Sequence, residues 1–270
     1  MTTGQRGGGL AQVPTVPAGH DLLRGRSVVV TAAAGTGIGS AAARRCLDEG
    51  ARVMLSDRHE RRLEETRAEL AKEYGDDVVL AQPCDVTDDE QVRALVSGAA
   101  ARLGRIDVMV NNAGLGGTRS VVEMTDEEWD SVLDVTLNGT FRCTRAALRQ
   151  MAHQERGGVV VNNASVVGWR AQAGQAHYAA AKAGVMALTR CAAIDAAPLG
   201  VRVNAVAPSI AMHEHLAKVT SDELLAELAG REAFGRAAEP WEVANVIVWL
   251  ASDYATYLTG EVVSVSSQHP

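Results

Sequence analysis

Two side chains that could act together lie four residues apart in an alanine-rich stretch. The segment "AHYAAAKAGV", residues 176 to 185, contains Tyr178 and Lys182. Residues at positions i and i+4 are neighbours on one face of a helix, so the phenol and the ammonium would lie side by side. A free tyrosine has a pKa of about 10, and a nearby cation lowers it toward neutral pH. The pair predicts a tyrosine that acts as an acid or a base, although the same spacing also occurs on solvated helix faces.

A third candidate, Ser165, ends the apolar segment "VVVNNAS" and lies 13 residues before Tyr178. This segment is typical of a buried strand, and Tyr178 would lie on the helix that follows it. A hydroxyl at a strand end and a phenol at the start of the next helix can converge on one carbonyl oxygen. The three residues therefore predict proton exchange with a carbonyl or alcohol substrate, in which Lys182 tunes Tyr178.

The elements that would position these side chains alternate along the chain. Short apolar runs predict strands at residues 27–32, 51–57, 77–85, 106–114, 157–165, 201–208 and 261–267. Amphipathic stretches predict helices at 38–49, 58–75, 88–103, 126–151 and 178–198. Strands that are apolar on both faces and separated by helices pair in parallel. We expect an α/β fold with a doubly wound, Rossmann-like parallel sheet of about seven strands, as a single domain at residues 23–270 after a flexible arm at 1–22.

A glycine-rich turn, "TAAAGTGIGSAA", follows the first predicted strand and opens the first helix. Glycines there let the backbone turn tightly and approach a pyrophosphate, whose charge the open N–H groups of a helix start favour. In doubly wound sheets, ligands bind beyond the carboxyl ends of the strands. The position between strand and helix therefore predicts a dinucleotide contact, although glycine turns end many strands. The residues predicted to make it are Gly35, Thr36, Gly37, Ile38 and Gly39.

The next strand ends supply further candidate cofactor contacts. Asp57 ends the second strand, where a carboxylate accepts hydrogen bonds from the adenosine ribose and repels a 2′-phosphate, which favours NAD. Arg58 follows it directly and could instead bind the 2′-phosphate of NADP. Asp85 could accept from the adenine amino group or cap the next helix. Small residues after the fourth strand would admit a ribose and a flat ring, and Asn111 could tie neighbouring strands together. The predicted contacts from these segments include Val86, Asn112, Ala113 and Gly114.

The net charge, the cysteine spacing and the length of the apolar runs limit the kinds of partner and site that can be expected. The net charge of −7 and the pI near 5.5 argue against a nucleic-acid binder, which would carry clustered lysine and arginine. The four cysteines lie far apart and form no C-x-x-C pair, so neither a metal site nor a disulfide framework is predicted, and buried thiols of a cytoplasmic protein are expected. No apolar run is long enough to span a membrane.

Several motifs in this order resemble the short-chain dehydrogenase/reductase family over about residues 25 to 268. They are the glycine turn, "NNAG", Ser165 with its spacing, Y-x-x-x-K at 178–182, "VRVNAVAP" and "LTGEVVSV". The resemblance implies hydride exchange between a nicotinamide and a carbonyl or secondary alcohol. It implies a catalytic set of Ser165, Tyr178, Lys182 and the residue at 136, and further cofactor contacts at Pro208, Ser209 and Ile210. A homotetramer built on the helices near 126–151 and 178–198 is also implied, with a dimer as the alternative.

The chain departs from the family pattern at several positions. Ala32 and Ala33 stand where the glycine motif has Thr and its first Gly, and Gly35 could compensate. The family's fourth catalytic residue, an Asn, falls on Thr136, and Asn138 lies about 200° round the helix from it. We expect a proton relay that is retained but altered. Other departures are Ser209, His213 and the ending Ser266, Ser267 and Gln268.

The substrate is predicted only as a class. Residues 209–235 would fold over it in the family, with Met212, His213, His215 and Leu216 lining an apolar mouth or simply packing a lid helix. Arg170 could contact an anion or lie exposed. The pattern is most similar to β-ketoacyl reductases, which implies a 3-oxoacyl thioester; a steroid-like or alicyclic ketone or alcohol is the alternative. An alternative of another class is an NAD(P)-binding sensor or scaffold without catalysis. Only Thr136, in place of the family's catalytic Asn, favours it.

Overall fold

Seven parallel strands form one sheet in the computed structural model, which describes residues 11–212 and 222–267. The strand order is β3-β2-β1-β4-β5-β6-β7, and every pair is parallel. The strands are β1 (Ser27–Thr31), β2 (Arg52–Ser56), β3 (Val79–Ala81), β4 (Val108–Asn111), β5 (Gly158–Asn163), β6 (Val201–Pro208) and β7 (Val262–Val265). The predicted single-domain, doubly wound sheet is confirmed.

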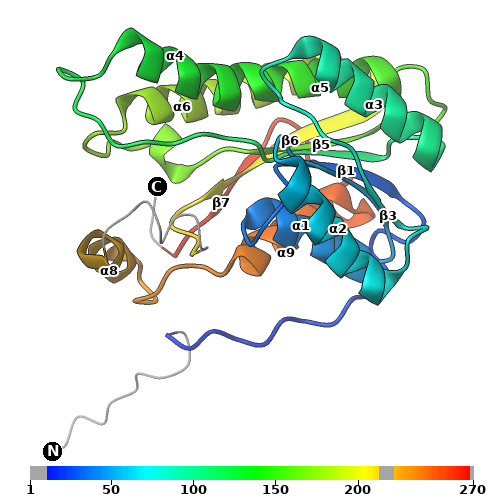
Figure 1. Ribbon diagram of the computed structural model, residues 1–270, viewed down its shortest axis with the longest axis horizontal. Helices are drawn as coiled ribbons and strands as arrows, with labels where there is room; N and C mark the ends of the chain where they lie inside the picture. Colours follow the sequence, from blue (N-terminus) through cyan, green and yellow to red (C-terminus); the bar gives the residue numbers. More distant parts are fainter. Residues whose placement is uncertain (1–10, 213–221, 268–270) are drawn as a thin grey trace, which may run out of the picture.

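Helices cover both faces of this sheet (Figure 1). One face carries α1 (Ile38–Asp48), α2 (Glu60–Tyr74) and α9 (Pro240–Ala251). The other carries α3 (Asp89–Leu103), α4 (Asp126–Leu133), α5 (Gly139–Met151) and α6 (Ala176–Ala196). Neighbouring residues of β1 point to opposite sides, so Val28 and Val30 join the core under α1 and α9, whereas Val29 joins the core under α3 and α5. This two-sided burial explains why the strands are apolar throughout.

Local sequence signals start the helices. Asp88 caps α3 by accepting from the N–H groups of Glu90 and Gln91. Thr125 and Glu128 form a reciprocal capping box at the start of α4. The sequence predictions did not include α9, and they covered α8 (Asp222–Arg231) only as a lid helix within residues 209–235. For α9 a signal was present, because Pro240 at the first helical position follows Glu239, which forms a capping box with Glu242.

Two predicted elements differ in extent from those observed. The third strand was predicted at 77–85, but only Val79–Ala81 pairs with β2. The helix predicted at 126–151 is interrupted by a π-helical turn at Asp134–Asn138, which contains Thr136. Such turns insert one extra residue and are frequent at functional sites. The turn therefore redirects the residue that stands at the family's Asn position.

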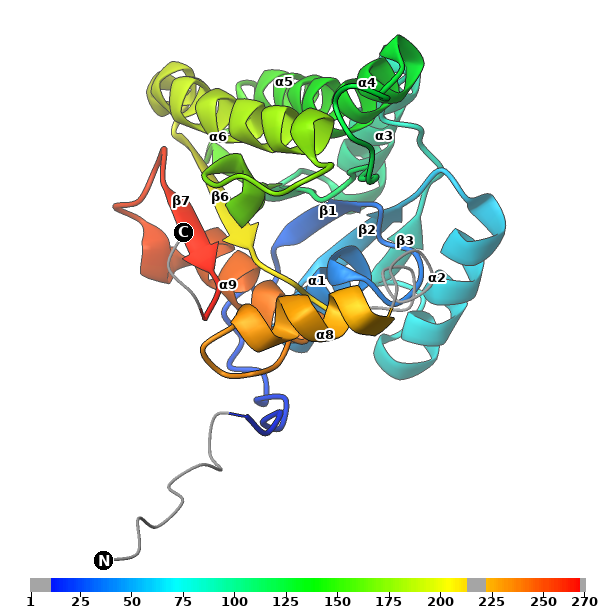
Figure 2. The same cartoon turned by 90° about the vertical axis from the view of Figure 1, so that its left-hand side faces the viewer.

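The carboxyl ends of the parallel strands lie along one edge of the sheet. From β1 the chain adds β2 and β3 on one side and β4 to β7 on the other, so the strand order reverses between β1 and β4. A crevice opens at such a switch point because the connections leave toward opposite sides. Figure 2 looks onto this edge and shows α8 passing in front of it. A ligand that spans the switch point would therefore meet the ends of β1, β4 and β5.

A buried ion pair fastens the segment that leads into β1. The Glu49 carboxylate, 1% exposed, accepts from Arg45 Nη2 at 2.9 Å. It also accepts from the backbone N–H groups of His20 at 2.8 Å and Leu22 at 3.0 Å. Arg45 further donates to the Pro17 carbonyl. Arg45 and Glu49 thus hold residues 17–22, within the predicted arm, against the C-terminal end of α1.

We predict that Glu49→Ala lowers the free energy of unfolding by about 3 kcal/mol, because it removes the acceptor of two backbone N–H groups and takes one of two carboxylate partners from the buried Arg45 guanidinium. Chemical denaturation measures this loss. Glu65→Ala is the matched control, since its partner Arg61 is exposed on α2 and such pairs contribute little. Equal losses in both variants would contradict the assignment.

Candidate active site

Ser165, Tyr178 and Lys182 come together beyond the carboxyl end of β5. Ser165 follows β5 in extended conformation, and its hydroxyl donates to the Pro208 carbonyl at 3.4 Å and accepts from the Val167 N–H. Tyr178 and Lys182 lie on the same face of α6, with Lys182 Nζ 5.5 Å from the centre of the Tyr178 ring. The predicted juxtaposition of phenol and ammonium is therefore present in the fold.

The electrostatics of this pair differ from the prediction. Burial raises the pKa of Tyr178 to about 12, and hydrogen bonding to Ser165 opposes this rise. Burial also lowers the pKa of Lys182 to about 7, so the ammonium gives up its proton far more readily than usual. The expected lowering of the Tyr178 pKa by Lys182 is wrong for this structure. A dry environment favours the uncharged form of both groups.

Lys182 is 2% exposed, and its Nζ donates to the backbone carbonyl of Asn163 at 2.5 Å. Asn163 is in turn tied to the end of β4, because its side-chain Nδ2 donates to Asn112 Oδ1 at 2.9 Å. Asn112 Nδ2 donates to the carbonyls of Thr31 and Ala32 at the end of β1. A chain of amides thus joins three strand ends beneath the site. Asn163 was not among the predicted residues, although "NN" at this strand end repeats the "NN" after β4.

On the opposite face of the sheet, Asn111 has the structural role that the sequence suggested. Its Nδ2 donates to Asn162 Oδ1 at 2.8 Å and to Thr144 Oγ1 at 3.0 Å, which ties β4 to β5 and to α5. Asn162 continues the network to Thr189 on α6. The two asparagine pairs therefore lock the register of β4 and β5 on both faces.

Thr136 is fully buried, and its hydroxyl is committed to one neighbour. It accepts from the Leu115 N–H at 2.9 Å and donates to the Leu115 carbonyl at 3.1 Å. Gly114 separates Thr136 from Lys182, since a Cβ on Gly114 would lie 3.8 Å from Thr136 Oγ1 and 3.5 Å from Lys182 Nζ. Asn138 donates to Asp134 instead, away from this contact. Thr136 therefore holds the loop after β4 in place.

The glycine turn has the geometry that a pyrophosphate needs. Gly35 adopts φ +84°, and a Cβ on Gly39 would lie 2.1 Å from the Ala32 carbonyl oxygen. Gly37 caps α1 without any side-chain hydrogen bond, and the first turn of α1 contains no acidic residue. The N–H groups at this helix start are thus left to an anion. Ala32 adopts φ +49°, a left-handed conformation that favours glycine, so the backbone is strained at this position of the turn.

The predicted adenosine contacts lie on either side of the turn. Asp57 accepts from the N–H groups of Ala34 at 3.3 Å and His59 at 2.9 Å, so it also shapes the turn. Arg58 is exposed. Asp85 accepts from the N–H and the hydroxyl of Thr87, and the cap of α3 is Asp88, so the capping alternative for Asp85 is wrong.

The segment after β6 closes the other side of the site. Pro208 ends β6, the Ser209 N–H donates to the Val265 carbonyl, and the Ile210 carbonyl accepts from Ala238. Met212 is the last residue described before the gap at 213–221. The predicted mouth residues His213, His215 and Leu216, and Gln268, lie outside the described residues. Ser267 donates to Glu232 through both its N–H and its hydroxyl.

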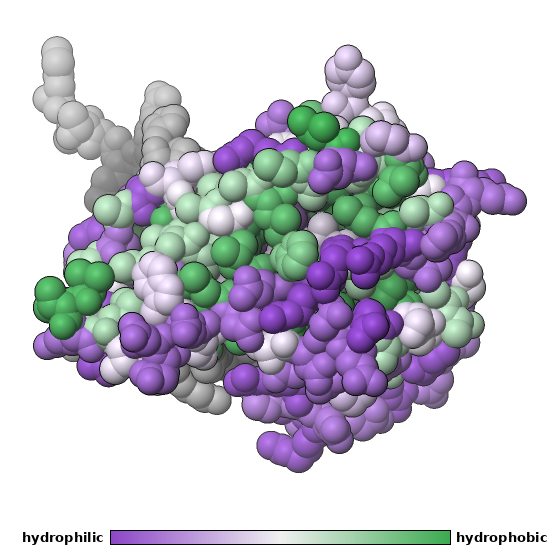
Figure 3. All heavy atoms as spheres, turned by 90° about the horizontal axis from the view of Figure 1, so that it is seen from above, coloured by the Kyte–Doolittle hydropathy of each residue, from purple (hydrophilic) through white to green (hydrophobic). Residues whose placement is uncertain are grey.

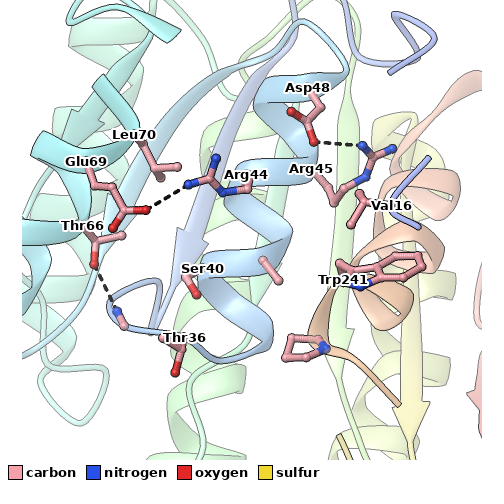
Figure 4. Close-up of a pocket in the computed structure, with 13 residues that line it drawn as sticks. Val16, Thr36, Ser40, Arg44, Arg45, Asp48, Thr66, Glu69, Leu70 and Trp241 are labelled. Carbon is pink, nitrogen blue, oxygen red and sulfur yellow. Dashed lines mark hydrogen bonds and ion pairs between the residues drawn. The ribbon is translucent and has the colours of Figure 1, made fainter. Parts of the chain in front are cut away.

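A cavity of about 310 Å³ lies beside the glycine turn, and Figure 4 shows the residues that line it, which do not include Tyr178. Gly35 and Thr36 contribute to one wall, and α1, α2, Trp241 and Val16 surround the rest. Both arginines that line the cavity already form ion pairs. Arg44 pairs with Glu69 and Glu73, and Arg45 pairs with Glu49. The cavity therefore does not provide a free cationic site for a phosphate.

Comparison with known proteins places this geometry in a family. The family model described as enoyl-(acyl carrier protein) reductase matches residues 32–267. A crystal structure of a short chain dehydrogenase from Mycobacterium smegmatis is 59% identical, with a TM-score of 0.87, and the match covers 97% of this chain and 100% of that one. The chain belongs to the short-chain dehydrogenase/reductase family. It is therefore an oxidoreductase that acts on a small molecule with a nicotinamide cofactor.

Two curated members of this family illustrate the range of related activities. The (5R,7aS)-5-hydroxy-7a-methyl-1-oxo-2,3,5,6,7,7a-hexahydro-1H-indene-carboxyl-CoA reductase of Mycobacterium tuberculosis is 65% identical, over 97% of this chain and 99% of its own length. A 3-oxoacyl-[acyl-carrier-protein] reductase of Staphylococcus aureus is 36% identical, over 89% of this chain and 96% of its own length.

Two further sequence predictions can be compared with the structure. Among the residues that the structure describes, no helix has the length and apolar character needed to cross a membrane. Cys46, Cys84 and Cys143 are buried and free, as expected, but Cys191 is free and exposed on α6, so the prediction of four buried thiols is wrong for that residue.

The lowered pKa of Lys182 predicts a pH dependence of stability. Between pH 7 and pH 9 the unfolded chain keeps a proton on this lysine that the folded protein has released, so folding becomes more favourable as the pH rises. The stability of the wild type relative to Lys182→Met should therefore increase by up to about 1.4 kcal/mol per pH unit. Denaturant titrations at both pH values measure it, with Lys72→Met on the exposed side of α2 as a control that leaves the pH dependence unchanged.

Proposed function

We propose that this oxidoreductase interconverts a ketone and a secondary alcohol at the end of β5. The observation that carries this proposal is the placement of Ser165, Tyr178 and Lys182 around one point beyond the sheet, facing the crevice that the glycine turn borders. A nicotinamide cofactor, when bound, supplies or accepts the hydride. The chain's own task is to bind, orient and exchange a proton.

Each of the three residues has a distinct part in that exchange. The Tyr178 phenol, neutral because burial raises its pKa, donates its proton to the carbonyl oxygen during reduction. Ser165 donates a hydrogen bond to the same oxygen and holds it in place. Lys182, with its pKa lowered to about 7, can return a proton toward Tyr178 near neutral pH. Thr136 fixes the adjoining loop, which is our interpretation of its position in the family's catalytic set.

For the substrate we propose an alicyclic ketone or alcohol that carries a coenzyme A thioester. The support is the name of the M. tuberculosis relative, which specifies an oxygenated indene ring joined to CoA. The surface near the site suits a ring, because Trp169, four residues after Ser165, is 41% exposed. A linear 3-oxoacyl thioester is the alternative, supported by the S. aureus relative. Arg170 is the residue we propose to contact an anionic group of such a substrate.

The cofactor is proposed to be NAD rather than NADP. Asp57 brings a carboxylate to the end of β2, where it would repel a 2′-phosphate. Arg58 is the argument for NADP, since its exposed guanidinium could reach a phosphate. The cytoplasmic location inferred from the cysteines stays a prediction.

A homotetramer, with a dimer as the alternative, is our proposal for the assembly, and light scattering would measure it. Figure 3 looks onto the face formed by α4, α5 and α6 and shows apolar side chains among the polar ones. Exposed apolar residues on these helices include Phe141 on α5 and Ile194 on α6, the latter 76% exposed. Such a surface favours close contact with a second copy.

The decisive experiment is a substrate panel measured with both NADH and NADPH. We expect oxidation of NADH with a 3-oxo or ring-keto CoA thioester, and a lower kcat/KM with NADPH because of Asp57. Absorbance of the reduced nicotinamide follows the reaction. Tight binding of NADH without turnover of any ketone would instead favour the sensor.

Replacement of the phenol provides a second test. Tyr178→Phe should lower kcat by about 100-fold or more, as expected when a general acid is removed, while the affinity for NADH stays nearly unchanged. Stopped-flow turnover and cofactor fluorescence measure the two quantities. Tyr257→Phe, a fully exposed tyrosine, is the matched control and should retain full activity. Equal activity of Tyr178→Phe and the wild type would refute the assigned role.

A further inference from the structure

His177 immediately precedes Tyr178 in the first turn of α6, and the proposed reaction gives it no part. Its imidazole is 2% exposed, and Nδ1 accepts a hydrogen bond from the backbone N–H of Tyr178 at 2.9 Å. The first N–H groups of a helix lack partners within the helix, and Gln175, at the start of α6, provides no side-chain cap. His177 therefore satisfies an open N–H at the residue that carries the phenol.

This hydrogen bond determines the protonation state of the imidazole. A ring nitrogen accepts only when it carries no proton, so this hydrogen bond requires an unprotonated Nδ1. His177 borders a cavity of about 230 Å³ that the loop 115–119 and α4 also line. Within the part of the chain that the structure describes, Nε2 makes no hydrogen bond. Protonation of the ring would therefore break the hydrogen bond at Nδ1 and no other hydrogen bond of the imidazole.

The loop over this cavity contacts both neighbouring rings. A Cβ on Gly117 would lie 3.3 Å from His177 Nε2, and a Cβ on Gly116 would lie 3.8 Å from the Tyr178 ring. Gln175 Nε2 donates to the Gly117 carbonyl at 2.8 Å, and Leu115 is held by Thr136. A displaced imidazole would therefore move the loop that packs on the phenol.

Two charged groups face His177 from the elements packed against it. Glu128 lies on α4 and lines the same cavity as His177, and its lowered pKa results chiefly from hydrogen bonds to Thr125 and Arg119. Arg119, on the loop, is 3.0 Å from Glu128 and balances its charge. From its own helix, the nearest titratable groups are Tyr178 and Lys182.

We propose that His177 is a positioning residue for Tyr178 and performs this role only while its imidazole is neutral. Protonation would turn Nδ1 into an N–H that faces the N–H of Tyr178, which breaks the cap and shifts the start of α6. Turnover should therefore decline when this ring gains a proton on Nδ1, whereas cofactor affinity should not. This inference rests on the proposed function, since it concerns the tyrosine assigned there.

Two substitutions of His177 distinguish the role of its hydrogen-bond acceptor from the role of its ring volume. His177→Asn offers an amide oxygen that does not titrate, and His177→Phe fills the space without an acceptor. We expect His177→Phe to lower kcat by about ten-fold or more, with KM and the Kd for NADH unchanged, because the phenol is misplaced. We expect His177→Asn to keep most of kcat and to lose the acid decline. Equal kcat in His177→Phe and the wild type, or equal losses and identical pH profiles in both variants, would overturn the proposal.

Amide hydrogen exchange at Tyr178 supplies a readout that needs no substrate. Exchange should accelerate in His177→Phe and, in the wild type, should show an acid-side loss of protection that His177→Asn lacks. If exchange at Tyr178 is the same in all three proteins, the proposed cap is refuted even if the enzyme is active. If the exchange pattern holds but no ketone is turned over, the proposed function fails and the cap stands.

Discussion

A lysine can stay inside a protein only if its ammonium meets acceptors or gives up its proton, and Lys182 does both. It is 2% exposed, its Nζ bonds to the carbonyl of Asn163, and burial brings its pKa to about 7. That carbonyl lies at the end of a central strand, so its position depends on the neighbouring strands. The site therefore depends on the register of the sheet as much as on the three reactive side chains.

The asparagines show how this register is maintained. Asn111 and Asn162 join β4 and β5 on the side of α5 and α6, whereas Asn112 and Asn163 join the same strands on the other side. The Nδ2 groups of Asn111 and Asn163 donate to the oxygens of Asn162 and Asn112, and a slip of one residue between the strands would separate both pairs. Through the strand register, these bonds therefore fix the positions of Ser165 and of the Asn163 carbonyl that accepts from Lys182. The asparagines at the ends of these apolar strands therefore position the reactive side chains.

A dry site has consequences for charge. Burial shifts both Tyr178 and Lys182 toward their neutral forms, and for Tyr178 it outweighs the hydrogen bond with Ser165. A neutral phenol suits reduction, since the proton is available when the oxygen of the substrate becomes basic. The loop after β4, held by Thr136 and packed on Tyr178 through Gly116, helps to keep the phenol in place.

Much of this protein could be predicted from its sequence, because the relevant signals are local. Apolar runs between amphipathic stretches determine a parallel sheet with helices on both faces, and the spacing of Tyr178 and Lys182 places them on one helix face. The capping box that begins α9 was equally local but was overlooked. The direction of the pKa shift of Tyr178, the bonding of Thr136 to Leu115 and the amide chain through Asn163 were decided only by the tertiary structure. Each depends on how deeply a group is buried and on which distant segment lies beside it, and neither can be read from the spacing of residues along the chain.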